Sequence, residues 1–138
     1  ILADEPTSGL DPAAAAESLG HLRELADSGK GVLLITHDIE AALKVADHIT
    51  IFCSGMTIEV ASAQDFKDGA NLRHPYTRAL WESLPGNNFI KAMPQAMSLT
   101  KNDGCPVLSG CQQRESARCG TTPELKAVNG GWVRCHFA

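Results

Sequence analysis

The sequence has no long apolar run, no surplus of basic residues and no recognisable export signal. Its longest apolar stretch, near residues 31–35, is far too short to cross a membrane. Acidic residues number 16 and basic residues 12, so the net charge of −4 does not favour nucleic-acid binding. The chain begins with Ile1 and shows no charged leader followed by an apolar segment. We therefore expect a soluble domain, or an incomplete part of one.

Cysteine is unusually frequent for so short a chain, with five in 138 residues. Cys53 stands alone in an apolar run and is predicted to be a small core residue. The other four lie in the last third of the chain and are Cys105, Cys111, Cys119 and Cys135. Because no export signal is present, metal or cluster ligation explains these four better than structural disulfides do.

Strand and helix patterns alternate along the first sixty residues. Asp11 and Pro12 favour the start of a helix over Ala13–Asp27, since an N-cap carboxylate and a proline in the first turn both stabilise that end. The apolar run Val32–Thr36 predicts a parallel strand buried on both faces, and a second helix is expected over Ile39–Ala46. The alternation predicts a parallel α/β sheet.

The pattern then changes along the chain. Two strands, at 49–53 and 57–60, flank Ser54-Gly55 and predict a hairpin, and an amphipathic helix is expected over 74–84. Beyond this helix glycine, asparagine, proline and cysteine dominate and the periodicity is lost. We therefore divide the chain into residues 1–60, a helical extension and linker at 61–103, and a small irregular Cys-rich tail at 104–138.

Two acidic residues directly follow the first strand. Asp4 and Glu5 stand at the carboxyl end of that strand, where α/β folds bind their ligands. Carboxylate oxygens suit Mg²⁺, and a second carboxylate can polarise a water molecule for attack on a phosphate. For an isolated Asp-Glu pair, however, solvated acids at a strand end are the more common explanation.

The longer string around this pair is far more specific. It runs Ile-Leu-Ala-Asp-Glu-Pro-Thr-Ser-Gly-Leu-Asp and resembles the Walker B motif and D-loop of ABC-type ATPases. The resemblance implies that Asp4 is the carboxylate that binds the Mg²⁺ of Mg-ATP, and that Glu5 is the catalytic carboxylate beside the attacking water. It also implies a D-loop that touches a partner nucleotide-binding domain, formed by Ser8, Gly9, Leu10 and Asp11.

A histidine follows the second strand. Taken alone, His37 is more often a packing or capping residue than a ligand of phosphate. The string Ile-Thr-His-Asp around it resembles the switch-histidine motif, or H-loop, of the same family. The resemblance implies that His37 contacts the γ-phosphate of ATP, while Asp38 is a candidate N-cap of the next helix.

Three motifs of that family are absent from the chain. It has no G-x-x-x-x-G-K-[ST] phosphate loop, no Leu-Ser-Gly-Gly-Gln signature and no Q-loop. These precede Walker B in the family, so residues 1–60 resemble the C-terminal part of its nucleotide-binding domain. The family topology implies a partial P-loop NTPase (RecA-like) parallel sheet that lacks the phosphate-loop strand, with a gap between Val32–Thr36 and Ile49–Cys53 and exposed edges that favour self-association. We expect this chain alone neither to bind ATP tightly nor to hydrolyse it.

The segment His-Pro-Tyr-Thr-Arg-Ala-Leu at residues 74–80 resembles the C-terminal extension of oligopeptide, dipeptide and nickel importer ATPases. We treat it as a family marker without a catalytic role. The resemblance implies an ATP-binding subunit that couples ATP hydrolysis to transport at the inner, cytoplasmic face of the cell membrane. It implies as partners a second ATPase subunit, identical or different, and membrane permease subunits, with no nucleic acid. Peptide and nickel remain open as transported substrates.

The tail cysteines are separated by gaps of five, seven and fifteen residues. These gaps match neither a zinc ribbon nor the bacterial ferredoxin pattern, although four thiolates suit Zn²⁺ or an iron–sulfur cluster equally. The tail also resembles the cysteine-containing extension of the peptide importers, some of which carry a [4Fe–4S] cluster there. The family form Cys-Pro-Phe-x-Pro-Arg-Cys is only partly kept between Cys105 and Cys111. An autonomous metal- or iron–sulfur-binding interaction module without ATPase activity is therefore the alternative function.

Overall fold

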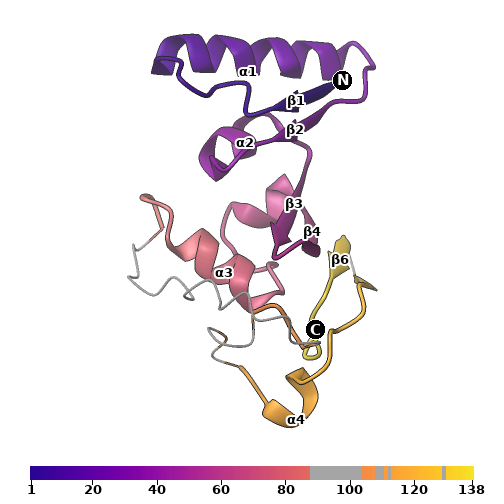
Figure 1. Cartoon of the computed structure of the whole chain (residues 1–138). Helices are drawn as coiled ribbons and strands as arrows, with labels where there is room; N and C mark the ends of the chain where they lie inside the picture. Colours follow the sequence, from indigo (N-terminus) through magenta and orange to yellow (C-terminus); the bar gives the residue numbers. More distant parts are fainter. Residues whose placement is uncertain (88–103, 108–110, 112, 129) are drawn as a thin grey trace. The chain divides into compact units, whose positions relative to one another are not determined.

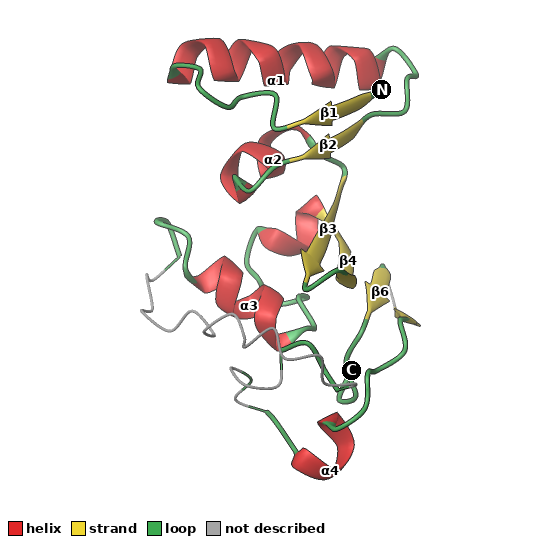
Figure 2. Ribbon diagram, in the orientation of Figure 1, coloured by secondary structure: helices red, strands yellow, loops and turns green. Residues whose placement is uncertain are grey.

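The computed structural model describes residues 1–87, 104–107, 111, 113–128 and 130–138. The chain divides into two compact units, Ile1–Asp47 and His48–Ala138. Each unit contains both helices and strands (Figures 1 and 2). The first has a parallel pair of strands and the second an antiparallel sheet, so the fold is mixed α/β.

The first unit is a parallel β–α–β arrangement followed by a second helix. Strand β1 (Leu2–Asp4) pairs in parallel with β2 (Leu33–Ile35). Helix α1 (Pro12–Asp27) connects the two strands, and α2 (Ile39–Val45) follows β2. The helices predicted here and the parallel pairing are confirmed, with boundaries that differ by one residue in each helix.

Specific residues at each end of α1 determine where the helix begins and ends. The carboxylate of Asp11 accepts hydrogen bonds from the N–H groups of Ala13 at 2.9 Å and Ala14 at 3.1 Å, and Pro12 is the first helical residue. These contacts confirm the predicted N-cap. After the helix the chain reverses at Gly29, whose φ of 89° lies in the left-handed region that favours glycine.

The prediction that the second strand is buried on both faces is wrong for this unit. Leu33 and Ile35 are 60% and 46% exposed, and Leu2, which lies opposite Leu33, is 68% exposed. Alternate residues of a strand point to opposite faces. Among the described residues of this unit, only the face with Ala3 and Leu34 is partly covered. Strand β2 is as apolar as a strand that is buried on both faces, but one of its faces is exposed.

The second unit contains a four-stranded antiparallel sheet in the order β3-β4-β6-β5. Its strands are β3 (His48–Cys53), β4 (Met56–Ser62), β5 (Lys126–Val128) and β6 (Gly131–Val133). The predicted hairpin is confirmed, because β3 and β4 join at Ser54-Gly55, where both residues have positive φ as in a tight hairpin turn. The predicted gap beside β3 concerns strands of two different units, and it stays a prediction.

The described residues of the second unit also form three short helices. They are the 3₁₀ helix η1 (Ala63–Phe66), α3 (Pro75–Glu82) and α4 (Ser116–Cys119). The core of the unit is apolar, and Cys53 lies in it as predicted; its fully buried members include Ile58, Leu72, Val107 and Val133. No helix in the described part of the chain is long and apolar enough to cross a membrane.

The tail is more regular than predicted, because β5 and β6 extend the sheet of the β3–β4 hairpin. On β6, Trp132 lies opposite Val60 of β4. A Cβ atom on Gly131 would lie 1.9 Å from the carbonyl oxygen of Val60, so only glycine allows this close approach. The sequence does contain a signal for this hairpin in Asn129-Gly130, since that dipeptide is typical of two-residue turns.

Candidate functional site

The carboxyl ends of β1 and β2 lie side by side. Asp4 is the last residue of β1 and lies opposite Ile35, the last residue of β2. Glu5 continues the pairing, since its N–H donates to the carbonyl of Ile35 at 2.9 Å. The two acidic residues therefore come to the same edge of the parallel pair as His37, which follows β2.

Glu5 and His37 are in direct contact. Nδ1 of His37 lies 2.9 Å from Oε1 of Glu5, and the backbone N–H of His37 donates to the same oxygen at 3.1 Å. The side chain and the backbone of one residue thus hold a single carboxylate oxygen. These two contacts orient the carboxylate, which is what a group that positions a water molecule requires.

The contact also changes the proton affinity of the histidine. The hydrogen bond to Glu5, and then its negative charge, raise the pKa of His37 above its ordinary value. The His37 side chain is 87% exposed and that of Glu5 is 36% exposed, so both can be reached from solvent. A raised pKa keeps the imidazole protonated up to higher pH, and a protonated imidazole donates from both ring nitrogens.

The backbone at Glu5 adopts an uncommon conformation. Its φ of 45° lies in the left-handed region, which residues other than glycine rarely occupy. The N–H of Ser8 donates to the Glu5 carbonyl at 3.1 Å and closes a turn directly after the strand. Such conformations cost about 1–3 kcal/mol and gather at functional sites, where surrounding contacts maintain them.

The predicted D-loop residues connect β1 to α1, and all four are exposed. Gly9 has a φ of 76°, which only glycine adopts readily. The apolar side chain of Leu10 is 45% exposed. Asp11 caps α1, so it has a structural role here in addition to the predicted contact with a partner domain. Ser8 begins the segment and closes the turn after Glu5.

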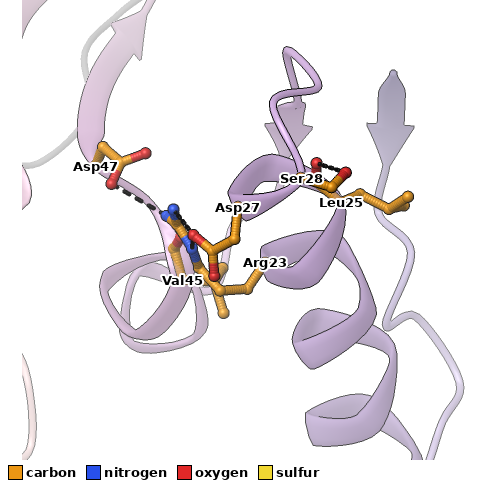
Figure 3. A network of polar contacts seen from close by, with 6 residues as sticks. All are labelled: Arg23, Leu25, Asp27, Ser28, Val45 and Asp47. Atoms are coloured by element: carbon orange, nitrogen blue, oxygen red, sulfur yellow. Dashed lines mark hydrogen bonds and ion pairs between the residues drawn. The ribbon is translucent and has the colours of Figure 1, made fainter.

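Arg23 fastens α1 to the end of α2 (Figure 3). Its guanidinium donates to the carbonyl of Val45 and to the carboxylate of Asp47, both at 3.0 Å, and it also pairs with Asp27 on its own helix. The hydrogen bond from Arg23 lowers the pKa of Asp27. This network as a whole was not predicted from the sequence, although the four-residue spacing of Arg23 and Asp27 is a local signal for part of it.

The start of α2 is fixed as predicted. Asp38 accepts a hydrogen bond from the N–H of Ala41 at 3.0 Å, and its own N–H donates to the hydroxyl of Thr36 at 3.1 Å. The contacts confirm Asp38 as the N-cap. His37 lies between Thr36 and Asp38, so these hydrogen bonds also limit the positions its backbone can adopt.

The four tail cysteines are free thiols. Cys119 and Cys135 are buried, Cys105 and Cys111 are half-buried, and the N–H of Cys105 donates to the carbonyl of Cys119 at 3.0 Å. Burial, and to a smaller extent the charges of other tail cysteines, raise the pKa of Cys105 and Cys111. Across the described ranges, however, no three His, Cys, Asp or Glu side chains are placed to hold a metal ion. The predicted zinc or iron–sulfur site therefore has no support in this geometry.

The fold and the site are consistent with the class of protein that the two sequence motifs resemble. A parallel β–α–β unit carries the Walker B-like string at the end of β1 and the H-loop-like string at the end of β2, and Glu5 of the first touches His37 of the second. Two motifs recognised separately in the sequence thus meet in one place. The class that both motifs resemble is the ATP-binding subunit of ABC transporters.

Several known proteins that resemble this chain are ATP-binding proteins of peptide transport systems. The chain is 33% identical to the peptide transport system ATP-binding protein SapD of Salmonella typhimurium, and 32% identical to SapD of Escherichia coli O157:H7, over 99% of its own length and 44% of theirs. It is 31% identical to a putative peptide import ATP-binding protein of Brucella ovis, over 95% of this chain and 43% of that protein. No family model matches the chain. The chain is thus homologous to the C-terminal portion of a peptide-importer ABC ATP-binding subunit, and it spans less than half the length of these relatives.

Proposed function

We propose that this chain is the part of a peptide-importer ATP-binding subunit that supplies the hydrolytic carboxylate and the switch histidine. The observation that carries the proposal is the contact between Glu5 and His37 at the ends of two parallel strands. The names of the relatives refer to peptide transport and peptide import, which favours peptides over nickel as the transported class.

In this proposal Asp4 binds the Mg²⁺ of Mg-ATP. Asp4 is exposed at the carboxyl end of β1. In nucleotide sites Mg²⁺ is usually held by one or two carboxylates together with phosphate oxygens and water, so one aspartate suits the ion. When bound, Mg²⁺ neutralises the charge that develops on the transferred phosphate.

Glu5 and His37 have separate roles in the proposed hydrolysis of ATP. Both contacts with His37 use Oε1 of Glu5, so the second oxygen of this carboxylate is the one that accepts a hydrogen bond from the attacking water. Nδ1 of His37 is engaged with Glu5, so Nε2 is the nitrogen that donates to an oxygen of the γ-phosphate. The catalytic contribution is mainly positioning and charge stabilisation.

The partners belong to the same proposal. The exposed loop with Leu10 contacts a second ATP-binding subunit, and the pair drives membrane permease subunits from the cytoplasmic face of the membrane. Because the chain contains no phosphate loop, its Glu5 and His37 cannot by themselves hold a nucleotide in place. We therefore expect no tight ATP binding or hydrolysis by this chain alone. The metal-module alternative is not favoured, since the described residues form no metal-binding group.

A chimera tests the proposed function. The part of Salmonella SapD that precedes the matched segment is joined to this chain, and release of phosphate from Mg-ATP is compared with that of the 138-residue chain alone. We expect turnover by the chimera only, and a loss of about 100-fold or more in its Glu5→Gln variant.

The control is Glu24→Gln, which makes the same chemical change at an exposed position of α1 and should leave turnover unchanged. ATP binding by the Glu5→Gln chimera verifies that it is folded. Full turnover in Glu5→Gln would contradict the proposed role of this carboxylate.

A further inference from the structure

A fully buried carboxylate lies outside the proposed ATP site. Glu59 is on β4 in the second unit and is 0% exposed. It lies opposite Ile51 of β3 on one side and Val133 of β6 on the other. Burying a carboxylate is costly unless its oxygens receive hydrogen bonds. The position of Glu59 in the middle of an apolar sheet therefore requires compensating partners.

The backbone just before α3 supplies these partners. The N–H of Arg73 donates to Oε1 of Glu59 at 2.8 Å, and the N–H of His74 donates to Oε2 at 3.0 Å. Both carboxylate oxygens are thus used, each by a different backbone group. Hydrogen bonds to an ionised acceptor are stronger than neutral ones. Glu59 consequently joins β4 to the start of α3.

His74 extends this cluster toward the tail. Its side chain is 0% exposed, and its Nδ1 accepts the N–H of Tyr76 at 3.1 Å, so it caps α3. The ring lies near the backbone of Arg134, which follows β6, but its buried Nε2 has no hydrogen-bond partner among the described residues. With Nδ1 as an acceptor, a neutral imidazole carries its proton on Nε2. His74 therefore bonds the start of α3, and its proton on Nε2 lies buried near the tail without a bond to it.

Arg134 binds the tail to the same strand. Its N–H donates to the carbonyl of Ile58 at 2.8 Å, and its Nε donates to the carbonyl of Thr57 at 2.8 Å. Its Nη1 donates to the carbonyl of Pro123 at 2.9 Å. A single residue thus joins β4, the end of β6 and the segment before β5. The next residue, Cys135, is buried.

We propose that Glu59, His74 and Arg134 form a latch that docks the cysteine-bearing tail onto β4 together with the start of α3. Among the described residues only two pairs connect β6 directly to β4, so this short ladder alone gives the docking little support. Arg134 adds side-chain hydrogen bonds that join the tail to β4, and Glu59 accepts hydrogen bonds that join β4 to the start of α3. His74 caps α3 beside them. The latch gives the segment that begins at His74 a structural role. This inference does not depend on the proposed ATPase function.

The rate of thiol labelling tests whether the latch holds the tail within the second unit. Cys119 and Cys135 in the tail are 5% and 7% exposed, and Cys53 in β3 is 8% exposed. N-ethylmaleimide labelling of the 138-residue chain, followed residue by residue with mass spectrometry, reports separately on tail and hairpin. In Glu59→Gln we expect both tail cysteines to be labelled about tenfold faster, with Cys53 unchanged, because a local opening exposes only the tail.

Two further variants make the test decisive. Arg134→Gln should accelerate the same two tail cysteines, whereas Glu124→Gln, the same acid-to-amide change at an exposed tail position, should accelerate none. Unchanged labelling of Cys119 and Cys135 in both latch variants would overturn the inference. Equal acceleration of Cys53 would overturn it as well, because the variants would then loosen the whole unit.

Discussion

Two histidines of this chain respond to their surroundings in opposite directions. Exposed His37 has a raised pKa because it is hydrogen-bonded to Glu5. Buried His74 has a pKa lowered to about 4, because removal from water disfavours the charged imidazolium and the nearby backbone of Arg134 only partly opposes this. His37 is thus suited to bind an anion, whereas His74 is suited to remain neutral and to cap α3.

The burial of His74 predicts a loss of stability in mild acid. Its pKa is about 4 in the folded chain against an ordinary 6.5, so the unfolded chain binds the extra proton between these values. The stabilising contribution is complete above pH 6.5 and is lost as the pH falls toward 4. Between pH 7 and pH 5 we expect the free energy of unfolding to decrease by about 2 kcal/mol from this residue. Urea unfolding of the second unit at the two pH values measures it.

Substitution separates this effect from the titration of other groups. His74→Asn keeps a side chain that can cap α3 and should remove most of the difference between pH 7 and pH 5. His21→Asn, at an exposed position of α1, should not change it. An undiminished pH dependence in His74→Asn would show that another group is responsible.

Sequence motifs predict which residues form the candidate site, but they do not predict its conformation or contacts. The strings around Asp4, Glu5 and His37 indicate the residues, but not the left-handed backbone at Glu5, which depends on the turn that follows. The contact between Glu5 and His37 depends on the parallel register of two strands. Glu59 was missed because a single acid in an alternating strand is usually placed on the solvated face.

For the helices and strands, the sequence predicts where helices start and where the hairpin turns better than it predicts which strands pair. Asp11 and Asp38 start α1 and α2 as predicted, because a cap acts on backbone groups within the first turn. The pairing of β6 with β4 joins segments far apart in the chain, which no local pattern specifies. For the same reason the apolar run of β2 could not indicate that Leu33 would be exposed.

The close approach of Gly131 to Val60 leads to a prediction about strand β6. Gly131→Ala places a methyl group where the carbonyl of Val60 lies, so β6 must move away from β4. We expect the second unit to lose about 1–3 kcal/mol of stability. Hydrogen exchange should show lost protection at the β6 amides.

Gly31→Ala is the matched control, since a Cβ there meets nothing within 4 Å and its φ is not in the left-handed region. We expect it to change stability by less than about 0.5 kcal/mol. Normal protection of β6 in Gly131→Ala would contradict the pairing described above.

At the scale of the whole molecule, the chain consists of two compact units with different tasks. Residues 1–47 contain the candidate hydrolytic residues, and residues 48–138 contain the latch and the cysteines of the tail. The relatives are more than twice as long, since the match covers 44% of SapD. Under the proposed function, turnover therefore depends on segments that correspond to the rest of these relatives.

The proposed function depends most on the contact between Glu5 and His37 in the first unit. NMR titration of the His37 ring protons in the 138-residue chain tests this most directly. We predict a pKa above the ordinary 6.5 in the wild type and in the Glu24→Gln control, and a return toward that value in Glu5→Gln. The same His37 pKa in Glu5→Gln and in the wild type would contradict the account, because the two side chains would then not be in contact in solution.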